Sequence, residues 1–486
     1  MSGRSKILIV LGLVLGMIAG RPAGAFERLV PDFQVSQNGL EALSAARVAV
    51  FQNHNFIFSW DDFFCNEDPW GYSCYATTIY GRIVDAQGNP LGNELILEQS
   101  CPYLLFSNVA TDQNNNFLLS WVEDCWNIQI FARRFDSTGN ALGNAFRVDQ
   151  SELYRDIIGP DLAADGNNNW IIVWAEEGGD HIYQIYARRF DAAGNPLGDQ
   201  FEVNQTLADT YFPRISINLN NDFMVVWMAN SHIFMRRFDA NGNPLSDDTQ
   251  VDTAPGGNIY LRISDIVSDS NNNFIISWRD NRRFLYWESP CDIYVRRFDG
   301  NGNPLGNEFR VDQHAENNAY WIPASLAVDP NNNFMVTWNY NNNYWNDLET
   351  QIYARRYNAA GAPLGNPFRV DQCPSLGQCI GPAIAGAPNP NFIVAWRDHR
   401  NSVYDTYATI WGEAGPDGDG GGLPDDDDDG GGGCFQIAGG SYSGLLYMLP
   451  ALILLGVRSF RNLRCFGKRK KFRAIGVRAS VVSLQF

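Results

Sequence analysis

An apolar strand that ends in tryptophan recurs seven times along this chain of 486 residues. The copies have sequences such as NFIFSW, NFLLSW and NFIVAW, and their tryptophans lie 51 to 61 residues apart. The seven residues are Trp60, Trp121, Trp174, Trp227, Trp278, Trp338 and Trp396. Self-similarity at a nearly constant period is the signature of repeat architectures, in which each unit buries its apolar face against its neighbours. The repeat therefore constrains the fold more than any single residue does.

Each repeat contains four short segments separated by polar turns. The first is an apolar stretch such as 324–329, and the tryptophan strand follows after a turn such as 329–333. A third segment such as 186–191 (YARRFD) and a turn such as 192–198 (AAGNPLG) lead to a fourth segment, FRVDQ, as at 146–150. The segments are rich in β-branched and aromatic residues and are bounded by Asn, Gly, Asp and Pro, which is typical of strands. We therefore predict an all-β fold of four-stranded antiparallel units.

Seven such units favour a seven-bladed β-propeller. A four-stranded blade takes about 40–50 residues, and propellers have about 4–8 blades. In the last tryptophan strand, Phe392, Val394 and Trp396 alternate with Ile393 and Ala395, so both faces are apolar. A strand of this kind is buried on both sides. Blades packed around an axis provide that burial, although the coils of a solenoid would also provide it.

The phase of the repeat predicts how the ring closes. The first FRVDQ-like segment, FQVSQ at 33–37, precedes any complete repeat, and the last repeat ends at 407–411 without such a segment. We expect 33–37 to pair with 407–411 as the outermost strand of the last blade. This pairing would leave no open blade edge. The predicted propeller domain spans residues 26–413.

In architecture, the pattern resembles seven-bladed propellers of the WD-repeat and sialidase-like kinds. Neither family's motif is present, because the strands lack a Trp-Asp ending and the DxxGN turns only partly match the sialidase Asp-box. The repeats at 33–412 resemble bacterial surface proteins that carry ARRFDxxGNPLG repeats, a family without an established activity. This resemblance implies a surface location and no particular reaction.

Both ends of the chain indicate export. Residues 1–25 have a charged start, an apolar core and a small-residue cleavage site at Ala25, which is typical of a secretory signal peptide. At the other end, the Gly/Asp-rich segment 414–433 is typical of a flexible linker. The segment 434–457, Cys434 followed by an uncharged stretch, is long enough for a membrane helix, and the basic tail 458–486 is expected to stay cytoplasmic.

The linker, Cys434, the apolar segment and the basic cluster together resemble the Cys-containing C-terminal sorting signals of bacterial surface proteins. That resemblance implies processing at Cys434. The tail continues beyond the basic cluster, at 474–486, where sorting signals usually stop. A permanent single-pass anchor therefore remains an alternative. Either reading places the propeller on the cell surface or the periplasmic side, attached to the membrane through the C-terminal helix.

The net charge of −18 excludes some classes of ligand. The basic tail is included in that value, so the exported part is more acidic still, which argues against nucleic acid and anionic membranes as partners. The aspartates of the linker lack the spacing of a calcium-binding loop. We predict no cofactor, and the sequence indicates no oligomeric state.

The cysteines fit an oxidising compartment. We expect disulfides between Cys65 and Cys74 and between Cys373 and Cys379, because the members of each pair share one loop. A Cys101–Cys125 bond would join two loops of the second repeat, and Cys291 is left over. No pair has zinc-ligand spacing with histidines, so we predict no metal site.

Antiparallel connectivity sorts the connections onto two faces. The short, uniform turns such as 329–333 and 192–198 share one face, which we call the turn face. The variable loops that follow the tryptophan strands and the FRVDQ segments share the other, which we call the loop face. Variable loops on a rigid scaffold commonly carry binding sites. We place the candidate ligand-binding residues among the loop-face aromatics, namely Trp70, Trp126, Trp287, Trp321 and Trp345.

Exposed aromatics favour glycan or protein ligands. The predicted function is therefore a non-enzymatic binding module. One alternative is a sialidase-like or other polysaccharide hydrolase or lyase, with its acid/base pair drawn from carboxylates that follow the tryptophans, such as Asp61, Glu176, Asp280 and Asp398. Another is a passive structural surface protein. No catalytic residue stands out, and the Arg-Arg pairs of the third strands are expected to form cross-strand ladders with the Asp of FRVDQ.

Overall fold

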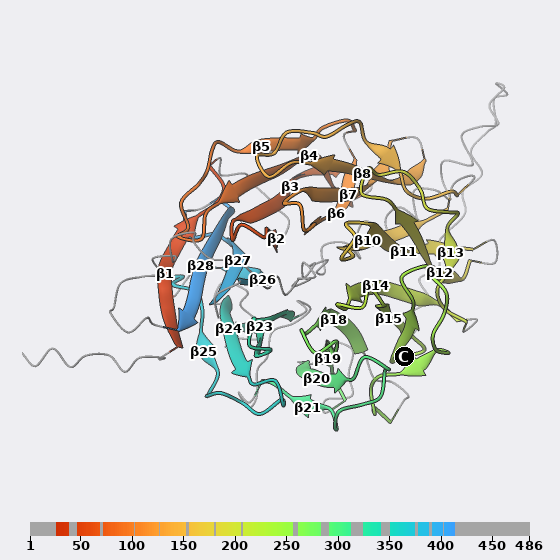
Figure 1. Cartoon of the computed structure of the whole chain (residues 1–486). Coiled ribbons are helices and arrows are strands. Elements are labelled where there is room, and N and C mark those ends of the chain that lie inside the picture. Colours follow the sequence, from red (N-terminus) through yellow and green to blue (C-terminus); the bar gives the residue numbers. More distant parts are fainter. Residues whose placement is uncertain are drawn as a thin grey trace, which may run out of the picture.

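The computed structural model places a ring of β-sheets around a central axis (Figure 1). It describes residues 26–413 apart from 38–45, 69–70, 102, 126, 152–154, 179–180, 206–207, 256–260, 283–290, 313–323, 342–349, 375–377, 388–390 and 402; for 63–68, 71–75 and 341 it describes the backbone alone. Within these residues all regular structure is β-strand, and no helix occurs. The all-β prediction is confirmed.

The strands form one eight-stranded sheet and five four-stranded sheets, and every pairing is antiparallel. The large sheet contains β2 (Arg47–Val50), β3 (Phe56–Asp68), β4 (Gly71–Val84), β5 (Leu95–Glu98), β6 (Leu104–Thr111), β7 (Phe117–Asp124), β8 (Ile128–Phe135) and β9 (Phe146–Arg147). The next two are β10 (Ile157–Ala164), β11 (Trp170–Glu177), β12 (Tyr183–Phe190) and β13 (Phe201–Glu202), and then β14 (Thr210–Ile217), β15 (Phe223–Ala229), β16 (His232–Phe238) and β17 (Thr249–Gln250).

The remaining sheets complete the ring (Figure 1). They are β18 (Leu261–Ser268), β19 (Phe274–Asp280), β20 (Asp292–Phe298) and β21 (Phe309–Arg310), and then β22 (Ser325–Val328), β23 (Phe334–Asn341), β24 (Thr350–Tyr357) and β25 (Phe368–Arg369). The last sheet has the order β1 (Phe26–Gln34), β28 (Asp405–Glu413), β27 (Asn391–Asp398) and β26 (Cys379–Ala387). The arrangement is propeller-like, with the first strand of each repeat toward the axis and the fourth at the periphery.

The eight-stranded sheet is a departure from separate four-stranded units. A single residue pair, Ala76 of β4 and Leu104 of β6, joins the first two repeats into one sheet. β4 is 14 residues long and extends beyond its own repeat toward the loop face, where β6 pairs with it. The sequence pattern does not predict this joint, because it depends on the loop after Trp60 continuing as a hairpin.

The predicted pairing of the two chain ends is confirmed, with a longer strand than expected. β1 pairs with β28 through residues that include Phe26 with Glu413 and Phe33 with Ala408. The strand covers 26–34 rather than 33–37, and the hydrogen bonding continues where the backbone nitrogen of Val35 donates to the carbonyl of Thr406 at 2.7 Å. Because β28 extends to Glu413, it offers a longer free edge than the FQVSQ segment alone can cover.

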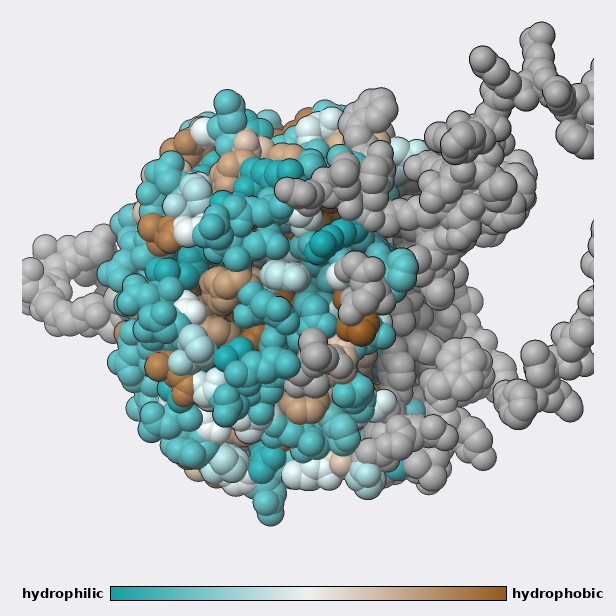
Figure 2. Space-filling view, turned by 90° about the vertical axis from the view of Figure 1, so that its right-hand side faces the viewer, coloured by the Kyte–Doolittle hydropathy of each residue, from teal (hydrophilic) through white to brown (hydrophobic). Residues whose placement is uncertain are grey.

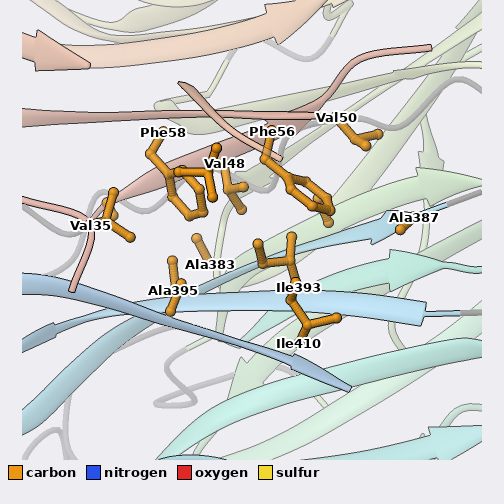
Figure 3. Close-up of a cluster of buried hydrophobic side chains, with 14 of the residues drawn as sticks. Val35, Val48, Val50, Phe56, Phe58, Ala383, Ala387, Ile393, Ala395 and Ile410 are labelled. Carbon is orange, nitrogen blue, oxygen red and sulfur yellow. The ribbon is translucent and has the colours of Figure 1, made fainter. Parts of the chain in front are cut away.

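The core lies between neighbouring sheets. All seven repeat tryptophans are buried, with at most 1% of their surface exposed. One cluster joins the first repeat to the last: Val48 and Phe58 from β2 and β3 lie against Ile393 and Ala395 from β27 (Figure 3). The apolar character of both faces of these strands is thereby explained, because each face packs against a different neighbour.

The polar turns of the turn face hold neighbouring repeats together. Asn115, Asn168, Asn221 and Asn332 have φ between 60° and 64°, a left-handed conformation that Asn tolerates. The side-chain oxygen of Asn168 accepts a hydrogen bond from the backbone nitrogen of Gln113 in the preceding repeat at 2.9 Å, and the other three make the same kind of bond. These turns therefore connect repeats as well as strands.

The prediction of cross-strand Arg–Asp ladders is wrong. The first arginine of each pair donates to carbonyl oxygens instead: Arg188 bonds Gly198 of its own turn at 3.2 Å and Val148 of the preceding repeat at 2.9 Å. The second arginine reaches the following repeat, as where Arg189 donates to Asn241 at 2.7 Å. The arginine pairs have a structural role, as expected. Their side chains are long enough to reach carbonyl groups of neighbouring sheets, whereas the predicted ladder needed contacts within one sheet only.

The structure contains two of the predicted disulfides. Cys373 is bonded to Cys379, with their Cα atoms 6.4 Å apart, and Cys101 is bonded to Cys125, with Cα atoms 6.0 Å apart. Cys65 and Cys74 are directly opposite each other in the β3–β4 register, and their disulfide stays a prediction. Cys291 is buried and belongs to neither of these two disulfides.

The predicted signal peptide (1–25, with Ala25), the linker, Cys434, the 434–457 helix and the basic tail lie outside the described residues. In the part of the chain that the structure does describe, no helix is long and apolar enough to cross a membrane. The export and anchoring of the chain stay predictions.

Candidate functional site

The five candidate tryptophans of the loop face, Trp70, Trp126, Trp287, Trp321 and Trp345, all lie outside the described residues. The structure therefore does not place any of them in a site. Two other polar groupings are described in full. One lies on the innermost strands, and the other lies at the loop face between the third and fourth repeats.

The innermost strands carry a series of mostly polar residues at one equivalent position. In each repeat this residue pairs in register with the one just before the repeat tryptophan, as Asp161 pairs with Val173 and Asp265 with Ser277. The series is Arg47, Asn108, Asp161, Arg214, Asp265, Ser325 and Ala383. A β-bulge interrupts the pairing just before this position in five of the repeats. Bulges often lie beside active sites, so this series is a candidate site.

The two carboxylates of the series are fully buried. Asp161 accepts hydrogen bonds from Asn108 Nδ2 at 2.6 Å and from the backbone nitrogen of Ile215 at 2.9 Å. Asp265 accepts from the backbone nitrogens of Ile266 at 2.9 Å and Leu326 at 3.0 Å. The partners of Asp161 come from the preceding and following repeats, and one partner of Asp265 comes from the following repeat, so each carboxylate joins neighbouring sheets.

Burial decides how these groups titrate. Desolvation raises the pKa of Asp265 to about 7, and hydrogen bonds from the backbone together with the positive charge of Arg214 oppose the increase. Burial likewise raises the pKa of Asp161, again against the attraction of Arg214. Raised carboxyl pKa values are common in acid/base catalysts. Here, however, both carboxylates accept hydrogen bonds from backbone N–H groups, which is a structural role.

The second grouping is a pair of tyrosines at the loop face, which we call the tyrosine pair. Tyr183 begins β12 after the loop that follows the tryptophan strand, and Tyr211 lies near the start of β14 in the next sheet. Their ring centroids are 5.1 Å apart and the rings are tilted by 44°. Both side chains are half-buried, so each ring keeps part of its surface in solvent.

Three carboxylates lie beside the tyrosine pair. The Tyr183 hydroxyl donates to Asp156 Oδ2 at 2.6 Å, and its backbone nitrogen donates to Asp209 Oδ1 at 3.1 Å. Glu177 contributes negative charge beside both rings and also contacts Nδ1 of the exposed His181 at 2.7 Å. The contacts with Asp156 and Asp209 hold Tyr183 in place, which lowers the entropy lost when a ligand binds its ring.

The same groups shift the titration of the tyrosines. Burial, together with the negative charges of Asp156 and Glu177, raises the pKa of Tyr183 above its usual range. Burial and the charge of Asp209 raise the pKa of Tyr211 to about 12. Both hydroxyls therefore stay protonated at neutral pH. They are available as hydrogen-bonding groups and are poor candidates for a nucleophile.

Four of the carboxylates that follow the tryptophans are engaged by other side chains. Glu176 accepts from the indole nitrogen of Trp174 at 3.2 Å and pairs with Arg155 at 3.1 Å. Asp398 accepts from Trp396 at 3.0 Å and from Arg400. Asp280 pairs with an arginine in the same way. Asp61 accepts a hydrogen bond from the Ser107 hydroxyl of the next repeat. These partners give the four carboxylates structural roles.

Sequence reasoning missed a motif that these contacts reveal. The fifth and seventh repeats share the sequence W-R-D-x-R, at 278–282 and 396–400. In both, the last arginine bonds the Asp of the motif and a second carboxylate of the outermost strand region, Glu308 or Asp32. The signal was present as an identity between two repeats. Its meaning required knowing that Asp32, at the other end of the chain, belongs to the last sheet.

Comparisons with known proteins give only distant similarities. No protein-family model matches the chain, and no curated protein matches it in sequence. Among solved structures, a protein of unknown function from Dyadobacter fermentans is 9% identical, with a TM-score of 0.47, and the alignment covers 80% of this chain and 99% of that one. A PL25 ulvan lyase is 10% identical, with a TM-score of 0.44 and coverage of 80% and 96%. A Hadza microbial sialidase is 9% identical, with a TM-score of 0.43 and coverage of 80% and 94%.

The tyrosine pair has a geometry that suits contact with a ligand. A rigid, partly exposed aromatic pair flanked by carboxylates can stack on a sugar ring and accept hydrogen bonds from its hydroxyl groups. The surface seen from the side of the ring is mostly hydrophilic, with small separate hydrophobic areas (Figure 2). A large apolar patch for protein docking is therefore not among the described residues on that side.

Proposed function

We propose that the chain is a seven-bladed β-propeller that is exported, held at the cell surface by its C-terminal segment, and binds glycans through its loop face. The tyrosine pair carries this proposal, because Tyr183 and Tyr211 are the described loop-face aromatics that two neighbouring sheets bring together, 5.1 Å apart. The five loop-face tryptophans, Trp70, Trp126, Trp287, Trp321 and Trp345, extend the proposed surface around the ring. The ligand class is glycan first, with a protein ligand as the alternative outcome.

The blade count rests on the repeat. Each of the seven repeats supplies the strands of one four-stranded unit, and β1 completes the last unit. Counting the eight-stranded sheet as two units joined by the Ala76–Leu104 pair supports the proposed number of seven blades.

The place where the chain leaves the domain supports display of the loop face. β27 runs from Asn391 at the turn face to Asp398 at the loop face, so the antiparallel β28 returns and ends with Glu413 at the turn face. The linker and the proposed anchor follow Glu413 in sequence. An anchor attached at the turn face would leave the loop face, on the opposite side, directed away from the membrane.

A glycan array probed with the full chain tests the proposal. We expect binding, and Tyr183→Ala and Tyr211→Ala should each weaken it roughly two- to tenfold, which corresponds to about 0.5–1.5 kcal/mol of aromatic contact. Tyr103→Ala is the matched control, because Tyr103 is an exposed loop-face tyrosine of another repeat, 42% accessible. Its substitution should leave the affinity unchanged.

Three outcomes would revise the proposal. Depolymerisation of a bound polysaccharide by the full chain would replace it with the hydrolase or lyase alternative. Binding to surface proteins but to no glycan would shift the ligand class. Retention of glycan binding in the two tyrosine variants, with loss in variants of the five tryptophans, would move the site along the loop face.

A further inference from the structure

A buried cluster of sulfur and oxygen atoms lies where the sheet β22–β25 meets the last sheet. Cys373 and Asp371 follow β25, Cys379 begins β26, and Asp398 ends β27. The sulfurs of Cys373 and Cys379 are 3.2 and 3.1 Å from Asp398 Oδ2. A carboxylate oxygen of Asp371 and the two sulfurs all lie within 4.8 Å of one another. At most 5% of any of the four residues is exposed.

In the structure the two cysteines form a disulfide, whose sulfurs are poor ligands for a cation. We propose that reduction of the Cys373–Cys379 disulfide creates a binding site for a zinc-like divalent cation. The ligands are the two thiolates and the carboxylates of Asp371 and Asp398. This inference is independent of the proposed glycan binding.

The donor set fits such a cation, and so does the distance of Asp398 from the two sulfurs. Zinc is bound tetrahedrally by thiolates at about 2.3 Å and carboxylates at about 2.0–2.2 Å, which separates the ligand atoms by roughly 3.3–3.8 Å. The Asp398 oxygen lies slightly inside this spacing from both sulfurs. Breaking the S–S bond lets the two sulfurs move apart, toward the spacing of tetrahedral zinc ligands. Two thiolates and two carboxylates select zinc or cadmium over magnesium and calcium, which prefer oxygen alone.

The charge balance gives the physical reason for a cation. The surrounding carboxylates and guanidinium groups are equal in number: Asp32, Asp371 and Asp398 against Arg28, Arg369 and Arg400. Each of these carboxylates therefore already has a guanidinium group beside it. Two buried thiolates would add two uncompensated negative charges, which is costly in a buried site. One divalent cation compensates these two charges.

The supporting contacts already orient the carboxylates. Arg369 holds Asp371 at 2.7 Å, and the backbone nitrogen of Ile352 donates to its other oxygen. Asp398 accepts from Trp396 Nε1 at 3.0 Å and from Arg400 Nε at 2.8 Å. Hydrogen bonds of this kind fix ligand geometry in metal sites. The sequence did not predict the cluster because its four residues come from three segments and include no histidine.

The chemistry balances as two steps. A dithiol reductant transfers two electrons and two protons to the disulfide and leaves as its own disulfide, which frees both cysteine thiols. Binding of the cation then releases the two thiol protons, because the thiolate is the metal ligand. A cation bound in this way would also oppose reoxidation, since both sulfurs are occupied.

The test uses the full chain and cadmium as the probe. Oxidised chain and chain reduced with a phosphine under nitrogen are titrated with Cd²⁺, and the ultraviolet thiolate-to-cadmium charge-transfer band is recorded. The chain has nine cysteines, so the comparison is with a Cys373→Ser/Cys379→Ser double variant. We expect the reduced wild-type chain to bind one more tightly held cadmium than the reduced double variant. A Cys101→Ser/Cys125→Ser variant should keep that cadmium, and Asp371→Asn should weaken it by at least about tenfold.

A second measurement needs no variant. In the reduced wild-type chain, Cd²⁺ should protect Cys373 and Cys379 from alkylation, as mapped by mass spectrometry of their peptides, while Cys101 and Cys125 remain reactive. Equal cadmium binding by the reduced wild-type and double-variant chains would overturn the proposal. Alkylation of Cys373 and Cys379 at the same rate with and without cadmium would also overturn it, since the thiols would then simply stay protonated beside Asp398.

Discussion

Arg400 Nη2 donates to Asp32 Oδ2 at 2.9 Å, although the two residues are 368 positions apart in the chain. The same arginine bonds Asp398 of its own repeat, so it fastens the N-terminal strand β1 to the last sheet. In the fifth repeat, Arg282 joins Asp280 to Glu308 in the same way, but there all three residues belong to one repeat. The first strand of the chain thus occupies the place that the repeat pattern leaves open at its end.

The Arg400–Asp32 contact should stabilise the closed ring. We expect Asp32→Asn to lower the free energy of unfolding by about 1–3 kcal/mol, because it weakens a charged hydrogen bond of a carboxylate that is largely buried. Glu202→Gln, an exposed carboxylate of another outermost strand, is the control and should change stability little. Urea unfolding followed by tryptophan fluorescence measures both. Equal effects of the two variants would mean that the contact does not contribute to closure.

Deletion of residues 26–34 should have a larger effect than any single substitution in β1. It removes the nine-residue strand that pairs with β28 and leaves the edge of β28 open. Open edges promote association with other chains. We expect a lower unfolding temperature and concentration-dependent oligomers in size-exclusion chromatography. A monomeric deletion variant with the wild-type unfolding temperature would show that closure is dispensable.

The turn asparagines allow the backbone and side-chain contributions to be separated. Asn168 has φ 63° and accepts a hydrogen bond from Gln113 of the preceding repeat. Asn168→Gly keeps the left-handed conformation accessible and loses only the hydrogen bond, whereas Asn168→Ala also adds backbone strain. We expect losses of about 0.5–1.5 kcal/mol for glycine and roughly 1 kcal/mol more for alanine. Thermal unfolding of the two variants gives the comparison, and a smaller loss for alanine than for glycine would contradict it.

The buried carboxylates predict how stability depends on pH. Burial raises the pKa of Asp265 and that of Asp312 to about 7 each, above the value of about 3.9 in the unfolded chain. For a raised pKa the stabilising form is the protonated one. Its contribution is complete below about pH 4 and is lost as the pH rises through 7. We therefore expect these two groups to make the domain less stable at pH 8 than at pH 6. The unfolding temperature of an Asp265→Asn variant should change less over this interval, and an unchanged slope would exclude Asp265 as a source.

The cysteine pairing can be checked directly. Cys65 and Cys74 are opposite each other in the β3–β4 register, so we expect non-reducing peptide mapping to find a third disulfide between them, beside Cys101–Cys125 and Cys373–Cys379. Cys291 is buried, and burial raises the pKa of its thiol. It should react with iodoacetamide only after unfolding. A mixed disulfide of Cys291 with Cys65 or Cys74 would refute this assignment.

The sequence by itself determined the repeat, the strand character and the burial of the seven tryptophans. These follow from local pattern, because residues such as Trp396 and Ile393 on opposite faces of one strand must both be covered. It also determined the pairing of the first and last strands, since a surplus segment at one end and a missing one at the other leave a single place for β1. The exact extent of β1 depended on the length of β28.

Only the tertiary structure decided which side chains of neighbouring repeats contact each other. The arginine pairs donate to carbonyls of neighbouring sheets, Asp161 and Asp265 accept N–H groups of the following repeat, and Tyr183 meets Tyr211 across a sheet boundary. The two cysteines of the Cys373–Cys379 disulfide and the two carboxylates beside it also come together from separate segments. The periodicity of the sequence shows how the side chains of one strand alternate between its two faces. It carries no information on the offset between adjacent sheets, and that offset sets which side chains come within contact distance.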